Sequence, residues 1–142
     1  MNTHTDNQIT VKVSINAPVE KVWKCFTTDE DIMGWNFASD TWHCPRAVND
    51  FRTGGSFSWR MEAKDGSFGF DFVGVYEYIN PPAEIRHTLA DGRKVRLCFE
   101  STGSTTTVTE TFEAENQNSL ELQKNGWQAI LDNFRKYVEA NP

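Results

Sequence analysis

The sequence predicts an α+β protein in which an antiparallel sheet of about six or seven strands packs against a long C-terminal helix. Three observations support this fold class. The chain ends in one long segment of helical periodicity, most of the preceding chain alternates apolar and polar residues, and two short helical segments follow the first strand. We expect residues 1–142 to form a single domain, because this length suits one core.

The long helix is predicted over residues Ser119 to Ala140. Its apolar residues recur at the i, i+3, i+4, i+7 spacing of an amphipathic helix. Polar residues between them, including Gln123, are expected to face water. Since the preceding segments resemble strands, any pocket should lie between this helix and a sheet. The predicted apolar stripe contains Leu120, Trp127, Ile130, Leu131, Phe134, Tyr137 and Val138.

The N-terminal third begins with a strand over residues 9–15, where apolar residues alternate with polar ones. Pro18 then suits the start of a short helix through Phe26. A second brief helix is predicted from Asp29 and should end at Gly34. Residues 38–45 have poor periodicity and are expected to form a loop or irregular lid, followed by a strand over residues 46–51.

A hairpin is predicted at Asp65-Gly66, a dipeptide typical of two-residue turns between alternating runs. This turn places Met61 opposite Phe70 and Trp59 opposite Phe72, all on one face. Beyond Gly74 the inward-facing set over residues 73–79 stays open, because two alternations compete there.

Two further turns set the pairing of the last three strands. A three-residue loop at residues 91–93 would place His87 opposite Leu97, and a two-residue turn at residues 103–104 would place Leu97 opposite Glu110. His87, Leu97 and Glu110 would then form one row, with the backbones of His87 and Glu110 roughly 10 Å apart on the inner face.

Composition argues against several classes of partner. The net charge of −6 provides no basic surface for nucleic acid, and no apolar run approaches the ~20 residues of a membrane span. Three cysteines without CxxC spacing are typical of reduced thiols, and no signal peptide precedes the first strand, so we expect a cytoplasmic protein.

Glu110 is the most informative polar residue, because strand parity places its carboxyl among apolar neighbours. In one interpretation Glu110 is a pocket acid or base with His87 as its counterpart, or both anchor a ligand. In the other, Glu110 pairs with an inward arginine or tyrosine and His87 is a core histidine. The residues alone leave both open.

No metal or cofactor is expected. His43 and Cys44 are adjacent and would point to opposite sides of an extended chain, and no neighbouring residue completes a zinc set. Trp42 and His43 are instead expected to rim a cavity. The residues predicted to contact a ligand are Trp35, Phe37, Trp42, His43, Phe57, Trp59, Met61, Phe70, Phe72, His87, Leu97, Glu110, Trp127 and Leu131.

Four segments carry a family resemblance: APVEKVW at residues 17–23, DFRTGG at 50–55, FGFDFVGVY at 68–76 and GWQAILDNFRKYVE at 126–139. With the order of elements, they resemble the helix-grip fold of the START-like (SRPBCC, Bet v 1-like) superfamily, in its bacterial branch related to the activator of the 90-kDa heat-shock protein ATPase. The resemblance implies a curved sheet around the C-terminal helix and binding of lipids, sterols, polyketides or other apolar ligands beneath it.

These features together predict a monomer or homodimer that binds a small, mainly apolar molecule between sheet and helix. Two alternatives follow from the same resemblance. One is an enzyme of cyclase, hydrolase or dehydratase type using Glu110 and His87, and the other is a chaperone-interacting module that stimulates an ATPase.

Overall fold

The computed structural model describes residues 8–140, which form one seven-stranded antiparallel sheet and three helices. The elements are β1 (Gln8–Ile15), α1 (Val19–Thr27), α2 (Asp29–Trp35), β2 (Trp42–Asn49), β3 (Ser56–Ala63), β4 (Gly69–Asn80), β5 (Glu84–Leu89), β6 (Lys94–Thr102), β7 (Thr105–Glu113) and α3 (Leu120–Ala140).

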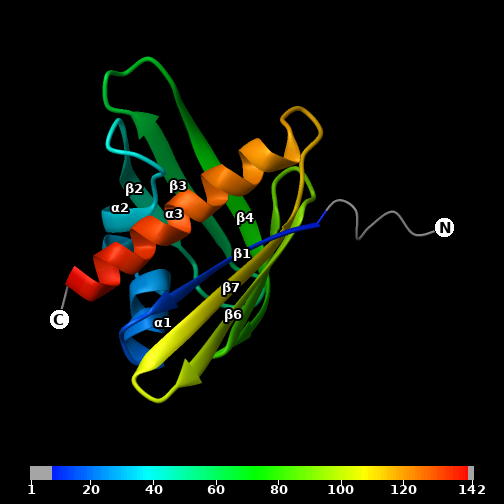
Figure 1. Cartoon of the computed structure of the whole chain (residues 1–142). Coiled ribbons are helices and arrows are strands. Elements are labelled where there is room, and N and C mark those ends of the chain that lie inside the picture. The colour runs from blue at the N-terminus through cyan, green and yellow to red at the C-terminus, as the bar shows by residue number, and fades with distance from the viewer. Residues whose placement is uncertain (1–7, 141–142) are drawn as a thin grey trace.

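The sheet has the strand order β1-β7-β6-β5-β4-β3-β2, so the first strand pairs with the last and β2 forms the opposite edge. Figure 1 shows the sheet curved around α3, which crosses its concave side at an angle, while α1 and α2 close one end. The predicted helix-grip architecture is therefore confirmed.

Strict alternation explains why most strands are where the sequence predicts them. In β1 every second residue is buried, as a strand with one solvent-facing side requires. The predicted pairs Trp59–Phe72 and Leu97–Glu110 both occur. Local turn chemistry was sufficient to set these two registers.

The predicted register between β5 and β6 was wrong by two residues. His87 pairs with Val95, not Leu97, because the loop is residues 90–92 and not 91–93. Leu89 N donates to Arg93 O at 2.8 Å. The residues that flank the loop are therefore Leu89 and Arg93, each one position earlier than predicted. Gly92 has φ of 93°, the left-handed conformation that the last residue of a three-residue hairpin loop adopts. His87 and Glu110 therefore belong to different rows.

The predicted loop over residues 38–45 was also partly wrong, because β2 starts at Trp42 and ends at Asn49. Its register shifts between His43 and Arg46, and this irregularity interrupts the alternation on which the prediction depended. Pro45 lacks an N–H donor, which an edge strand tolerates. The strand predicted over residues 46–51 overlaps the second half of β2, which ends two residues earlier, at Asn49.

Gly34 does not end the second helix, which continues through Trp35. The glycine is needed for a different reason, since the ring of Tyr137 occupies the space that a Cβ at position 34 would fill. The Tyr137 hydroxyl donates to Asp31 Oδ1 at 2.6 Å, which fixes that ring against α2. Gly34 therefore allows α3 to approach α2 closely.

The open question over residues 73–79 is answered by an irregularity in β4 at Glu77. Tyr76 pairs with His87 and Tyr78 with Arg86, so Glu77 is an extra residue. Tyr76 consequently faces the core, whereas Tyr78 is exposed. The alternation of inward-facing and outward-facing residues therefore changes at Glu77, three residues beyond Gly74.

Residues 8–140 contain no helix with the length and apolar character needed to cross a membrane.

Candidate functional site: a cavity under the long helix

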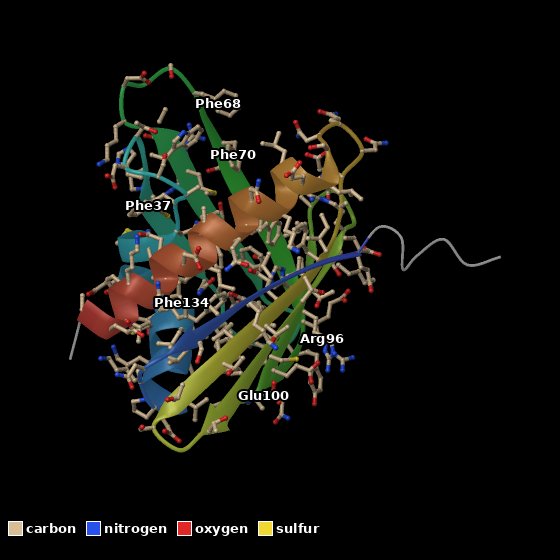
Figure 2. The ribbon with its side chains drawn as sticks, viewed as in Figure 1. Phe37, Phe68, Phe70, Arg96, Glu100 and Phe134 are labelled. Carbon is tan, nitrogen blue, oxygen red and sulfur yellow. The ribbon has the colours of Figure 1, made fainter. Side chains whose placement is uncertain are left out.

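A cavity of about 230 Å³ lies between the N-terminal half of α3 and the inner face of the sheet. Figure 2 shows Phe70 on β4 beside this half of the helix, with Phe68 nearer the tip of the β3–β4 hairpin. The cavity is lined by Phe26, Trp35, Asn36, Trp59, Met61, Phe70, Phe72, Arg93, Glu110, Glu115, Gln123, Trp127, Ile130 and Leu131.

The cavity exists because the two halves of α3 meet the sheet differently. In the C-terminal half, Phe134 is fully buried and its ring centroid lies 4.8 Å from that of Trp35. In the N-terminal half, Trp127 stacks flat on Phe112, with ring centroids 3.8 Å apart. Because Trp127 lies against β7, its ring reaches only the edge of Phe72, at 6.0 Å between centroids. The cavity is the unfilled space that remains beside the Trp127 ring.

Hydrogen bonds at the Asn49 side chain hold the aromatic wall on β3, and the sequence analysis did not predict them. Asn49 Oδ1 accepts hydrogen bonds from Trp59 Nε1 at 3.1 Å and from the Tyr76 hydroxyl at 2.9 Å. Asn49 Nδ2 also donates to Thr27 O at 3.1 Å, which ties the sheet to α1. With its indole N–H satisfied, Trp59 presents only ring surface to the cavity.

Glu110 projects into this aromatic space from β7. Its carboxyl is surrounded by protein atoms, yet the residue keeps part of its accessible surface because that surface borders the cavity. Among residues 8–140, no side chain or backbone group forms a hydrogen bond or ion pair with the carboxyl. Its neighbours across the strands are Val11 and Leu97. The interpretation in which Glu110 pairs with an inward arginine or tyrosine is therefore wrong.

Burial raises the pKa of the Glu110 carboxyl from its ordinary value of 4.5 to about 8. Removal from water disfavours the charged form, and no nearby cation or donor compensates for it. At neutral pH the group is therefore mainly a neutral acid, which can both donate and accept a hydrogen bond.

Several other polar groups at the cavity are satisfied by the protein itself. Gln123 Oε1 accepts from Glu115 N at 2.9 Å, while its Nε2 donates to Asn118 O at 2.8 Å. The Arg93 guanidinium donates to Asp91 at 2.8 Å, and Trp35 Nε1 donates to Cys25 O at 2.9 Å.

Gln123 was expected to face water and is instead 7% exposed, while Leu120, expected in the apolar stripe, is 52% exposed. The reason lies in the loop before α3. The Gln123 amide accepts from one backbone group of this loop and donates to others, which requires it to turn inward. The helix therefore begins with its apolar stripe displaced from the sheet.

The structure divides the predicted ligand-contacting residues into two sets. On the cavity wall are Trp35, Trp59, Met61, Phe70, Phe72, Glu110, Trp127 and Leu131. Away from it are Phe37, Trp42, His43, Phe57, His87 and Leu97.

His87 is a core residue. It is 4% exposed, with the Phe57 ring at 4.9 Å and the Tyr76 ring at 6.1 Å between centroids, and its Nδ1 has no hydrogen-bond partner. Burial lowers the pKa of the imidazole to about 4. Because the β5–β6 register differs from the prediction, His87 lies two strands and one row from Glu110, a backbone separation on the order of 12 Å. The predicted acid–base pair is not assembled.

The other predicted residues that lie away from the cavity contact different parts of the molecule. Trp42 packs on Phe68 and Phe70 at the hairpin, with ring centroids 6.0 and 6.2 Å away. His43 Nε2 lies 3.6 Å from Glu62, whereas Cys44 is buried, so the two adjacent residues do point apart. Phe37 packs against the core outside the cavity, and Leu97 is fully buried in the sheet beside Glu110.

Six wall residues were not predicted: Phe26, Asn36, Arg93, Glu115, Gln123 and Ile130. Ile130 was in the predicted stripe, and its neighbour Leu131 was included, so helical periodicity could have indicated it. Asn36, Arg93 and Glu115 lie in connections between elements, where periodicity gives no information on direction.

A curved sheet around a C-terminal helix, with an aromatic cavity between them, defines a helix-grip protein of the START-like class. The family described as Activator of Hsp90 ATPase homolog 1-like protein matches residues 16–139, and the chain belongs to this family.

Solved structures agree with this assignment. An AHSA1-like protein from Aeromonas hydrophila is 41% identical, with a TM-score of 0.88, and the match covers 94% of this chain and 92% of that one. A protein from Cytophaga hutchinsonii is 50% identical, with a TM-score of 0.82 and coverage of 95% and 94%. Protein NE0264 from Nitrosomonas europaea, at 18% identity, shares the fold over all of both chains with a TM-score of 0.84. The comparison with curated proteins gave no match.

Proposed function

We propose that this protein binds a small, mainly apolar molecule in the cavity between α3 and the sheet. The observation that carries the proposal is an aromatic cavity of about 230 Å³ that contains one carboxyl with no partner among residues 8–140. Ligand sites are typically apolar spaces with a few polar groups that fix orientation. The free cysteines Cys25, Cys44 and Cys98 are in keeping with a reducing, cytoplasmic setting.

The size of the cavity limits the ligand. Its volume is below the ~300 Å³ at the lower end of drug-sized sites. It is about half as large again as the ~150 Å³ apolar cavity that accepts benzene. One aromatic ring with a short side chain therefore matches the space better than a sterol or long-chain lipid.

Thermal unfolding with added 2-phenylethanol, indole or ethylbenzene tests this proposal. A ligand at 100 times its Kd should stabilise the protein by about 2.7 kcal/mol. The substitution Ile130→Phe should remove the effect, because residue 130 lines the cavity and a larger ring would occupy it. Leu122→Phe is the matched control, since Leu122 is exposed on the same helix. Equal stabilisation of both variants, or none of the wild type by any compound, would contradict the proposal.

The enzyme alternative receives less support from the geometry. Its two residues, Glu110 and His87, lie in different rows, and only Glu110 borders the cavity. Glu110 could still act alone as a general acid, because its raised pKa keeps it protonated at neutral pH.

The family match supports a second candidate function, stimulation of a chaperone ATPase. The test is the ATPase rate of the Hsp90 from the same host with and without this protein. A stimulation that survives Ile130→Phe would separate this activity from ligand binding, and an unchanged rate at saturating protein would contradict it.

A further inference from the structure

The Glu110 carboxyl has no hydrogen-bond or charge partner among residues 8–140. A carboxyl in an apolar site is costly unless a hydrogen bond or an opposite charge compensates for it. Residues 8–140 offer neither, although Glu110 borders an open cavity. A bound molecule could provide both, and the chemistry of the surrounding wall indicates which kind of molecule.

The other polar atoms of the cavity favour a ligand that donates hydrogen bonds. Cys44 Sγ donates to Arg46 O and accepts from Asn36 Nδ2, which leaves Asn36 Oδ1 as an acceptor without a donor among the described residues. The donors of Trp35, Trp59 and Gln123 are used within the protein. Of the described wall residues, Trp127 contributes an indole N–H with no protein acceptor. Together with the two carboxyl oxygens of Glu110, Asn36 Oδ1 gives the cavity more unpaired oxygen acceptors than the one indole donor of Trp127.

The charges at the cavity favour a cation. Arg93, the basic residue on the wall, is neutralised by Asp91 at 2.8 Å. Glu115 accepts hydrogen bonds from Asn118, and these bonds lower the pKa of its carboxyl, so it is ionised. Arg93, its partner Asp91 and Glu115 together carry one net negative charge beside the cavity, even before Glu110 ionises.

Aromatic rings form another part of the cavity wall. Trp59 lies 5.8 Å from Phe72 between ring centroids, and Phe72 lies 6.0 Å from Trp127, so three adjacent rings border the cavity on the sheet and helix sides. Ring faces attract a cation within about 6 Å, most strongly when the cation is desolvated. An apolar body attached to that cation would pack on the same rings.

We infer that the cavity binds a small arylalkylamine, with its ammonium group against the Glu110 carboxylate and its ring among Trp59, Phe72 and Trp127. This inference rests on the proposed function and names the class of ligand. The ammonium supplies donors only, which matches the acceptors of Glu110 and Asn36. The positive charge of the ammonium compensates for ionisation of the buried Glu110 carboxyl, and the ligand's aromatic ring fills the rest of the cavity.

Binding of such an amine depends on pH in a defined direction. The groups around Glu110 are Val11 on β1, Leu97 on β6, and Gln123 and Trp127 on α3, none of which titrates. Arg93 and Glu115 lie in the flanking loops, where Arg93 is paired with Asp91 and the lowered pKa of Glu115 keeps its carboxyl ionised near neutral pH. Glu110 is therefore the group whose ionisation is coupled to binding.

The experiment is isothermal titration calorimetry with 2-phenylethylamine and 2-phenylethanol, two probes of nearly equal size that differ in the cation. Binding of the amine below pH 8 requires Glu110 to release its proton, so affinity should rise roughly 50-fold from pH 6 to pH 8. It should then rise only about twofold further until the amine loses its own proton near pH 10. Affinity for the alcohol should change less than threefold over the same range.

Glu110→Gln keeps the shape of the side chain and removes its charge. This variant should lose the pH dependence and at least tenfold of the amine affinity at pH 8, and a cooperative urea unfolding transition should show that its fold is intact. Glu121→Gln is the matched control, since Glu121 is exposed on α3. Binding of the alcohol without preference for the amine would overturn this inference and leave the proposed function standing. Absence of binding by both probes would overturn both.

Discussion

The two halves of α3 contact the same sheet and do so in opposite ways. The C-terminal half buries Phe134 and Val138 completely, and Tyr137 bonds to Asp31 on α2. The N-terminal half buries Gln123, leaves Trp127 and Ile130 partly accessible, and exposes Leu122. One half is a close-packed core and the other covers a cavity.

The comparison shows how one helix can provide both stability and a binding space. Close packing supplies stabilising contacts wherever side chains interdigitate. An unfilled space gives up those contacts but remains available to a ligand. His87 and Glu110 follow the same division, because His87 lies in the packed core and Glu110 on the cavity wall.

The largest expected effect tests the packed half. Phe134→Ala should lower the free energy of unfolding by about 3–5 kcal/mol, because it leaves a void among Phe26 and Trp35. Ile130→Ala, on the cavity side, should cost about 1–2 kcal/mol, since part of this side chain already faces open space. Urea unfolding followed by circular dichroism measures both, and equal losses would argue against the division of α3.

The second prediction concerns Glu110 and the pH dependence of stability. Its pKa is 4.5 ordinarily and about 8 in the folded protein, so the folded state binds more protons between these values. Stability should therefore fall as pH rises from 4.5 to 8, by roughly 3–4 kcal/mol from this group. In Glu110→Gln this decline should disappear from urea midpoints measured at pH 5 and pH 8. A decline as steep as in the wild type would show that the carboxyl is hydrated or paired.

The third prediction concerns His87, for which the sign is opposite. Its pKa is lowered from 6.5 to about 4, so the unfolded chain binds more protons in that range. The stability that comes from keeping His87 neutral is present above pH 6.5 and is lost as pH falls to 4, by roughly 2–3 kcal/mol. His87→Leu should unfold less readily than the wild type at pH 4 and similarly at pH 7. A variant equally sensitive to acid would refute the assignment.

The smallest expected effect tests the contact between α2 and α3. Gly34→Ala should destabilise the protein by about 1–2 kcal/mol, because the added methyl group meets the Tyr137 ring, although alanine is the better helix former. In a Tyr137→Ala background the same substitution should be neutral or stabilising. A double-mutant cycle of unfolding free energies separates the two terms. Additive effects would mean that the ring moves aside without cost.

Much of the fold could be predicted because its determinants are local. The Asp65-Gly66 turn and the alternation in β3 and β4 give the pairing of Trp59 with Phe72, and parity alone places Glu110 on the inner face. Failures occurred where a single residue shifts the pattern. A loop placed one residue too late moved His87 into the row of Glu110, and an irregularity at His43 concealed the start of β2.

The sequence by itself therefore determined the order of elements, the face on which most strand side chains lie and the presence of an inward carboxyl, since these depend on periods of two and 3.6 residues. Only the tertiary structure decided that Glu110 has no partner in the described part of the chain, that His87 is remote from it and that Gln123 turns inward. Those outcomes depend on how far α3 stands from each strand, a distance set by side chains that are far apart in the chain.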